Sequence, residues 1–454
     1  MSLREAIQTY HTLLTDDLAA ATQEQLEEQQ RRRGLFFGVR PLCTVLRPRF
    51  MTPEQYSFLQ ARVHLLMQAF EKAYRAAIED ANFRKQFALL PWEEELVQYN
   101  PGFRDPSPTS RVDTFFVTDR GGLRLTEYNA DTPASPAYND ELADIFYGMP
   151  VMRQFQRDYE VRALPGRHGV LHSLLDAYEQ WAGRSEKPRI AILDWREVPT
   201  YSEFVLFEKF FKEQGIECII TDPREVEYRN GRLMAGDFHI TLIYKRVLAS
   251  ELVERGGMDH PVVRAVLDGA VCMVNPFRCK ILHKKASLAV LSDERNAGLF
   301  TLNELEAINA HIPWTCLVEE RHAQFHDKSG TYAIDLIPFI LAHREQLVLK
   351  PNDEYGGKGV TLGWLCSSDE WEKAILEAMS NPFVVQERVT IPTEPFPSMI
   401  DGKVTFLERM LDTNPLVFYG DYVDGCLSRL SAEALLNVTA GTGSAVATFV
   451  VEKR

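Results

Sequence analysis

The sequence predicts a protein of mixed α and β structure (α+β or α/β class), with a helical N-terminal region followed by two regions that combine strands with helices. Three observations support this class. Residues 1 to about 95 show helical apolar spacing, residues 187 to 275 alternate strand, helix and strand, and residues 276 to 454 mix helices with apolar strands. The chain has 454 residues, 45% of them apolar, a length typical of two or three domains or subdomains.

Composition indicates which classes of binding partner and which cellular compartment suit the protein. Lys and Arg number 50 against 64 Asp and Glu, and the net charge of −14 disfavours non-specific binding to nucleic acid or to an anionic membrane. The seven cysteines are scattered, without a C-x-x-C pair or zinc-ligand spacing. The N-terminus is charged and amphipathic, and no apolar run approaches the roughly 18 residues of a membrane span. We therefore expect a cytoplasmic protein without nucleic-acid or membrane partners.

The N-terminal region is expected to form core helices. In the segment 51–81, Thr52 stands as N-cap, Pro53 lies in the first turn and Gln55 completes a capping box. An apolar face at helical spacing predicts packing against the core rather than a cofactor site. The residues of this face are Phe58, Leu59, Val63, Leu66, Met67 and Phe70.

Between about 111 and 131 the pattern predicts two short strands joined by a turn at 119–122. Glu127 and Asn129 are two residues apart, so on a strand their side chains point to the same face. With Asp113 at the corresponding end of the other strand, they offer the hard oxygen ligands that magnesium takes when it bridges phosphates. A surface hairpin with solvated charges is the alternative interpretation.

The middle region predicts a small α/β unit with parallel strands. Its amphipathic helix over 201–215 closes at Gly215. The first strand lacks a G-x-G-x-x-G turn, which disfavours nicotinamide binding despite the architecture. Lys245 and Arg246 end one of the strands. The expected strands are 189–195, 216–222, 240–246 and 271–277.

The C-terminal region contains the stretch VLKPNDEYGGKGV at 348–360, in which Lys350 ends a strand and three glycines follow. Glycines let a backbone approach a ligand closely, and their amides cradle phosphate oxygens beside a fixed lysine charge. The lysine precedes the glycines, so the stretch is not a P-loop, and a β-hairpin turn is the alternative. Further on, Ser367 and Glu370 predict a capped helix.

Two more segments favour a nucleotide. The stretch at 383–392 is an apolar strand that breaks into Gln386 and Glu387 before a proline, which suits a hinge around an adenosine, with an edge strand as the alternative. Four basic residues precede a helical apolar run, where an anion would meet positive charge and free helix-terminal amides. A solvated basic face is the equal alternative. These residues are Arg278, Lys280, Lys284 and Lys285.

In chain order, these motifs resemble the circularly permuted ATP-grasp proteins of the glutathionylspermidine synthase-like family. In an ordinary ATP-grasp chain the lysine and glycine-loop half comes first, whereas here the acidic half precedes it, as in the permuted family. No papain-like amidase domain is expected. The motifs, which cover about 105 to 430, are Arg111-x-Asp113, EYNADTP, NPF, HKKASLAVL, LVLKPNDEYGGKGV and VVQERV.

The resemblance implies an ATP-grasp fold in permuted order. Its four parts would be an N-terminal helical region (1–104), the acidic metal-binding half (105–186), a pre-ATP-grasp-like α/β domain (187–275) and the ATP-binding half (276–454).

The resemblance also implies residue roles. Two magnesium ions would be held by Asp113, Glu127 and Asn129, and Arg111 would face the transferred phosphoryl group or the acyl phosphate. Arg111 and Lys350 would be the catalytic residues. Because HKK stands in place of the family's usual Asn-Lys pair, either Lys284 or Lys285 is the ATP lysine, and Lys285 is favoured. Substrate contacts would be Lys245, Arg246 and Arg429. ATP would contact Lys285, Lys350, Tyr355, Gly356, Gly357, Lys358, Gly359, Gln386, Glu387 and Val389.

The implied activity is that of an ATP- and Mg²⁺-dependent carboxylate-amine ligase. ATP would convert a carboxylate to an acyl phosphate, and an amine would displace phosphate to give an amide or peptide bond and ADP. The partners would be ATP and small carboxylate and amine substrates of amino-acid, peptide or polyamine type. Their identity, the pathway and the oligomeric state do not follow from the sequence. A small-molecule kinase and a nucleotide-binding protein without catalysis stay open as alternatives.

Overall fold

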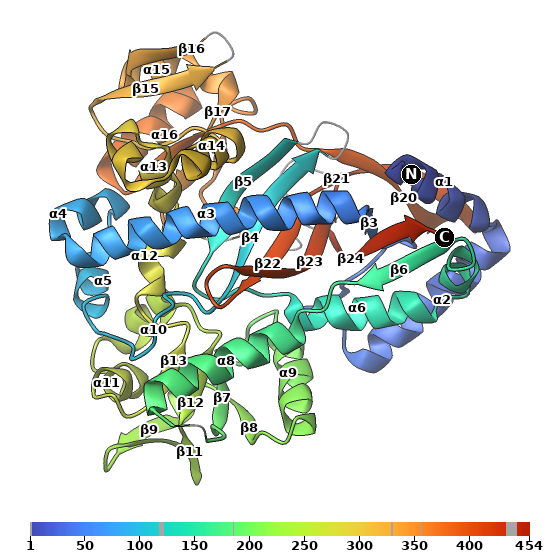
Figure 1. Ribbon diagram of the computed structural model, residues 1–454, viewed down its shortest axis with the longest axis horizontal. Helices are drawn as coiled ribbons and strands as arrows, with labels where there is room; N and C mark the ends of the chain where they lie inside the picture. The colour runs from blue at the N-terminus through green and yellow to red at the C-terminus, as the bar shows by residue number, and fades with distance from the viewer. Residues whose placement is uncertain (1, 118–121, 185, 328–329, 355, 433–442) are drawn as a thin grey trace.

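The computed structural model describes residues 2–117, 122–184, 186–327, 330–354, 356–432 and 443–454, and it has the mixed α and β architecture that the sequence predicts. Figure 1 shows a large central sheet, with a parallel sheet and its helices on one side and a smaller lobe on the opposite side. Within the described residues, no helix combines the length and the apolar character needed to cross a membrane.

The central sheet is mostly antiparallel. Its main path runs β20-β21-β23-β22-β4-β5, and β24 adds to it by pairing with β23, β3 and β6. The hairpin predicted for residues 111–131 is β4 with β5, although residues 118–121 of its turn lie outside the described part. The strands are β3 Arg49–Met51, β4 Thr109–Val117, β5 Gly122–Asn129, β6 Tyr159–Ala163, β20 Thr393–Ile400, β21 Lys403–Leu411, β22 Asn414–Phe418, β23 Tyr422–Ser431 and β24 Ser444–Lys453.

The C-terminal region is divided between two sheets. Strand β22 pairs antiparallel with β4, and Leu416 lies opposite Arg111 in the register. The strands from Thr393 onward therefore complete the sheet of the acidic hairpin, while the strand that carries Lys350 belongs to the smaller lobe. The whole of β22 is buried, so the interior of the central sheet depends on this distant segment.

Helices of the N-terminal region cover one face of the central sheet (Figure 1). The longest, α3, begins with the predicted capping box: Thr52 accepts from the Gln55 amide and the Gln55 side chain accepts from the Thr52 amide. Its apolar face packs in one core with β4, β5 and the helices near residue 290. The elements are α1 Leu3–Leu13, α2 Asp16–Arg33, β1 Phe36–Phe37, β2 Arg40–Pro41, α3 Pro53–Glu79, α4 Ala81–Arg84 and α5 Pro91–Leu96.

The middle region forms the predicted parallel sheet, in the order β13-β12-β7-β8. An antiparallel meander, β9-β10-β11, lies beside it. The strands are β7 Ile190–Leu193, β8 Cys218–Thr221, β9 Val226–Arg229, β10 Arg232–Ala235, β11 Phe238–Ile240, β12 Leu242–Lys245 and β13 Cys272–Val274. The helices of this part and of its connection to the central sheet are α6 Pro136–Gly148, α7 Pro150–Phe155, α8 Arg167–Ala182, α9 Tyr201–Glu213, α10 Ala249–Gly256 and α11 Pro261–Leu267.

The smaller lobe is built on the antiparallel sheet β14-β19-β17-β18, with the hairpin β15-β16 beside it. Helix α16 starts with the predicted capping box of Ser367 and Glu370, and its Trp371 is buried in the lobe core. The elements are α12 Cys279–His283, α13 Ala286–Ser292, α14 Leu302–His311, β14 Thr315–Leu317, β15 His322–Asp327, β16 Gly330–Asp335, α15 Leu336–Ala342, β17 Leu347–Pro351, β18 Thr361–Leu362, α16 Ser368–Ser380 and β19 Phe383–Glu387.

Candidate functional site

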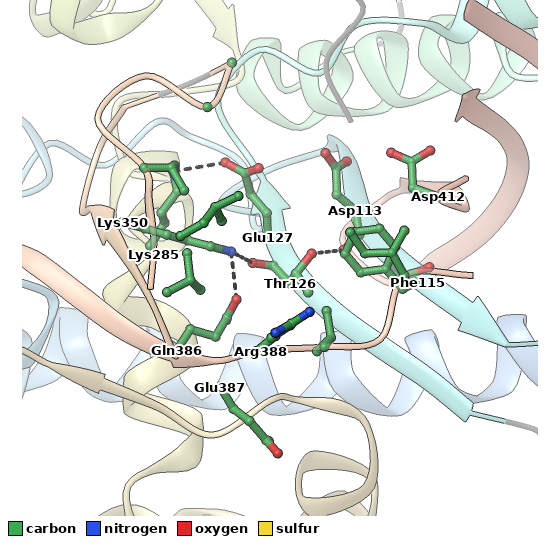
Figure 2. A pocket seen from close by; sticks show the side chains of 18 of the residues that line it. Asp113, Phe115, Thr126, Glu127, Lys285, Lys350, Gln386, Glu387, Arg388 and Asp412 are labelled. Carbon is green, nitrogen blue, oxygen red and sulfur yellow. Dashed lines mark hydrogen bonds and ion pairs between the residues drawn. The ribbon is translucent and has the colours of Figure 1, made fainter. Parts of the chain in front are cut away.

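A pocket lies where the acidic hairpin of the central sheet meets the smaller lobe. Its empty space measures about 1020 Å³, open solvent at the mouth included, which is large enough for a nucleotide-sized ligand. Strands β4 and β5 contribute Asp113 and Glu127, and strands β17 and β19 contribute Lys350 and Gln386. Figure 2 shows these side chains around one space, although they come from distant parts of the sequence.

Two lysines of the smaller lobe reach the hairpin across this pocket. The Lys350 ammonium donates to Gln386 Oε1 at 2.7 Å and to the Thr126 carbonyl at 3.3 Å. The Lys285 ammonium lies 3.0 Å from a Glu127 carboxylate oxygen and donates to the Glu354 carbonyl at 2.6 Å. Burial lowers the pKa of Lys350 to about 8, against the opposing effect of the Glu127 charge.

The structure separates Lys284 from Lys285. Lys284 is buried and pairs with Glu93 at 2.6 Å and with Asp353 at 3.0 Å. Lys285 lines the pocket, and Lys284 is absent from the pocket lining. This geometry supports Lys285 as the pocket lysine of the pair.

Asp113 is held by two arginines. Arg111 donates to its two carboxylate oxygens at 2.7 and 3.2 Å, and Arg429 donates to it at 2.7 Å. Burial raises the pKa of Asp113, but the charges of Arg111 and Arg429 lower it more strongly, to about 2. The predicted Arg429 therefore does reach the site, where it contacts an acid of the hairpin.

Asp412 is a pocket residue that the sequence analysis missed. It is buried, and it accepts from the Arg429 backbone amide and from Arg429 Nε, both at 2.6 Å. Figure 2 shows the carboxylates of Asp412, Asp113 and Glu127 pointing to the same side of the pocket. A signal was present: Asp412-x-Asn414 repeats the acid-x-amide pattern of Glu127-x-Asn129.

The chemistry of the hairpin suits magnesium. Asp113 lies opposite Glu127 in the β4-β5 register, and both line the pocket with carboxylate oxygens, which are hard ligands. Asn129 does not line the pocket, and the atom of its side chain that has no partner in the structure described is the nitrogen, a donor that does not ligate a cation, so only its amide oxygen could bind magnesium. Among the described residues, no three His, Cys, Asp or Glu side chains form a ready metal cluster. A metal would therefore be completed by oxygens from elsewhere, such as ligand phosphates or water.

The glycine stretch forms a tight loop over the pocket. Gly356, Gly357 and Gly359 have φ of 65°, 78° and 70°, a region that favours glycine. Gly356 and Gly357 line the pocket, and a Cβ on Gly359 would lie 2.7 Å from Pro351 Cγ. The predicted Lys358 is 3.0 Å from Glu354, and the predicted Tyr355 lies outside the described residues.

The predicted hinge borders an apolar end of the pocket. Gln386 is buried in β19, and Glu387 and Val389 also line the pocket. Apolar side chains continue this wall, and a flat ring could lie among them. They are Phe115, Val348, Val360, Leu362, Trp364 and Ile391.

Lys245 and Arg246 are not brought to this pocket. Lys245 is fully buried and forms an ion pair with Asp131. Arg246 donates to the Pro133 carbonyl and lies 3.6 Å from buried Glu203. In this structure both residues connect the parallel sheet to the segment after β5.

Comparisons with known proteins identify the fold. No profile of a known protein family matches the sequence, and no curated protein matches it. Among solved structures, a glutathione synthetase-like effector from Globodera pallida, in its apo form, has a TM-score of 0.55 and 14% identity, over 96% of this chain and 95% of that one. A D-alanyl-alanine synthetase A from Vibrio cholerae has a TM-score of 0.28 and 11% identity, over 57% and 74%, a score too low to support an argument. The chain therefore shares the fold of a glutathione synthetase-like protein along nearly its whole length.

Proposed function

We propose that this protein is an ATP- and Mg²⁺-dependent carboxylate-amine ligase that forms an amide or peptide bond and releases ADP and phosphate. The observation that carries the proposal is a single pocket in which Lys285 and Lys350, a glycine loop and the acids of a hairpin converge. The shared fold with a protein described as glutathione synthetase-like supports the same class of reaction. The motif order favours the circularly permuted ATP-grasp arrangement.

The lysines and the loop would bind the nucleotide. Lys350 and Lys285 supply positive charge for the phosphates, and the loop amides around Gly356 and Gly357 can donate to phosphate oxygens. The apolar end next to Val389 would hold the base. When bound, magnesium supplies charge neutralisation for the phosphates, and Asp113, Glu127 and Asn129 are the residues proposed to hold it.

The arginines would serve the reacting groups. Arg429 lines the pocket beside Asp113, and it would meet a substrate carboxylate or a transferred phosphoryl group there. Arg111 also donates to Asp113 but is absent from the pocket lining in this structure, so a direct contact with the phosphoryl group would require it to move. Guanidinium groups bind such oxyanions with two parallel hydrogen bonds. Catalysis of this kind depends on positioning and charge stabilisation, and it needs no covalent nucleophile from the protein. The glycine loop would exclude water from an activated acyl group.

The test is an assay of magnesium-dependent ADP release with pooled amino acids, small peptides, carboxylic acids and amines, followed by mass spectrometry of the products. A product equal to carboxylate plus amine minus water, formed together with ADP, is the expected result. An accumulating phosphorylated compound would instead establish the kinase alternative. Asp113→Asn is the matched variant, and normal turnover in it would contradict the metal assignment. If ADP and ATP analogues do not bind in calorimetry, the nucleotide proposal is wrong.

A further inference from the structure

A buried cluster of charges lies next to the segments that carry Lys285 and the glycine loop, and none of its residues lines the pocket. It contains equal numbers of acids and lysines, which come from five separate segments of the chain. Each lysine side chain is at most 2% exposed. The acids are Glu93, Asp131 and Asp353, and the lysines are Lys245, Lys280 and Lys284.

Lys280 is the centre of this cluster. Its ammonium lies 2.5 Å from Asp353, 3.5 Å from Glu93 and 4.0 Å from Asp131. Lys284 bridges the same Glu93 and Asp353 at 2.6 and 3.0 Å. Removing one acid would leave three buried lysines with only two acids, and such an uncompensated buried charge is more costly than the loss of an exposed pair.

Asp353 is the residue of the cluster that lies next to the glycine loop in the sequence. Its side chain is 19% exposed, the most of the six, because the glycine loop starts at the next residues. Its neighbour Asn352 is tied to the same segment by backbone and side chain: the Lys285 amide donates to the Asn352 carbonyl at 2.9 Å, and the Ala286 amide donates to Asn352 Oδ1 at 2.8 Å. Asn352 also donates to the Phe87 carbonyl at 3.0 Å.

The start of the loop and the pocket lysine are therefore held by one set of contacts. Residues 352–353 contact the segment 280–286 on both sides of Lys285. Asp353 forms ion pairs with Lys280 and Lys284, and Asn352 accepts hydrogen bonds from the amides of Lys285 and Ala286. At the other end of the loop, Gly359 lies against Pro351, so no side chain fits between them.

We propose that Asp353, through Lys280 and Lys284, is a positioning residue that fixes the base of the glycine loop and the backbone of Lys285 as one rigid unit. These contacts form an anchor that holds residues 352–353 against the segment 280–286. The effect of this anchor on ligand binding rests on the proposed function, because it assumes that the loop and Lys285 meet phosphates. The anchor itself does not depend on that assumption.

The test is hydrogen exchange measured by mass spectrometry on the full-length protein, with calorimetric titration of ADP as a second readout. In the wild type, the amides of Lys285 and Ala286, which both donate to Asn352, should exchange slowly and at a common rate, while the amide of exposed Gly357 at the loop tip exchanges quickly. Amides at the base that exchange as fast as the loop tip, or at unrelated rates, would overturn the proposal without any variant.

Asp353→Asn removes the charge and keeps the size. We expect exchange in the peptides covering 281–288 and 348–354 to rise by about tenfold or more through local opening, with the remaining peptides unchanged. We also expect ADP affinity to fall by about tenfold. Asp353→Glu should restore both partly. The control is Asp369→Asn, at an exposed carboxylate in the first turn of α16, which should change neither readout.

If the single variant does not fold, the charge-balanced pair Asp353→Asn with Lys284→Gln keeps the acid and lysine numbers equal and should still expose the base. Unchanged exchange at the base in a folded variant would overturn the anchor. A uniform rise across all peptides would do so too, because it would show a general loss of stability. If the wild type binds no ADP, the proposed function fails, and the exchange data still decide whether the anchor exists.

Discussion

The contact between Asp113 and its two arginines leads to a prediction about stability. The pKa of Asp113 lies at about 2, below its usual value of 3.8, because Arg111 and Arg429 outweigh the effect of burial. One pKa unit is worth about 1.36 kcal/mol, so ionised Asp113 contributes on the order of 2 kcal/mol to the folded state at neutral pH. Asp113→Asn preserves the shape and removes this contribution. For a chain of this length, the expected decrease in melting temperature is about 2 to 3 °C.

The pH dependence gives the sign of the effect. A carboxyl group whose pKa is lowered by folding stabilises the protein above its unfolded pKa, and this stabilisation is lost as the pH falls through the folded value. Urea and thermal unfolding at pH 7 should therefore show the full difference between the wild type and Asp113→Asn, and about half of it should remain near pH 3. The exposed Asp369→Asn is the control. An Asp113→Asn protein as stable as the wild type at pH 7 would refute the pairing with the two arginines.

Three further predictions concern the pocket. Burial lowers the pKa of Lys350 to about 8, so its ammonium loses its charge between pH 7 and 9, and ADP affinity should fall by about tenfold over this range. Lys350→Met should bind ADP weakly at both pH values. Binding by the wild type that does not depend on pH would contradict this role of Lys350. Gly359→Ala should weaken ADP binding, and it should reduce stability by more than the roughly 1 to 2 kcal/mol that a left-handed alanine costs, because its Cβ would meet Pro351. Gly183→Ala, at φ 66° with nothing within 4 Å, is the matched control. Equal losses of stability in the two variants would argue against the clash. Asp412→Asn should slow turnover more than it raises the KM for ATP, because Asp412 orients an arginine next to the reacting groups; a change in KM alone would assign it to nucleotide binding.

Local features of the fold were predictable from the sequence. The capping boxes at Thr52 and Ser367 are present as predicted, since the residues of a cap lie within one turn of each other. The pairing of β4 with β5 followed from apolar alternation on either side of a turn. The parallel sheet followed in the same way from short apolar runs separated by an amphipathic helix.

Features that depend on distant parts of the chain were not predictable in this way. Asp412 reaches the pocket because β22 pairs with β4. The Asp412-x-Asn414 pattern is visible in the sequence, but nothing near residue 412 indicates which strand this segment pairs with. Lys245 and Lys284 resembled ligand-binding cations because a lysine at a strand or helix end looks the same whether its counter-charge is a ligand or a buried acid. The acids that hold them, Asp131 and Glu93, lie more than 100 residues away in sequence, so only the folded structure distinguishes the two cases.

The balance of acids and bases in the pocket determines which ligand can bind without leaving a buried charge of the protein unpaired. In this structure the acids and the bases of the pocket neutralise one another, as Glu127 does with Lys285 and Asp113 with its arginines. A metal ion alone would have to displace those cations, and a triphosphate alone would have to displace those acids. A triphosphate that arrives with divalent cations can pair with both sets at once, because it carries little net charge.

Magnesium and nucleotide should therefore bind with positive coupling. By linkage, the factor by which magnesium strengthens ADP binding must equal the factor by which ADP strengthens magnesium binding, and we expect at least about tenfold. Calorimetric titrations of each ligand in the absence and presence of the other measure this factor. Lys285→Met is expected to reduce the coupling by freeing Glu127 for the metal beforehand. Binding that is simply additive in the wild type would mean that the ion pairs seen here do not compete with either ligand.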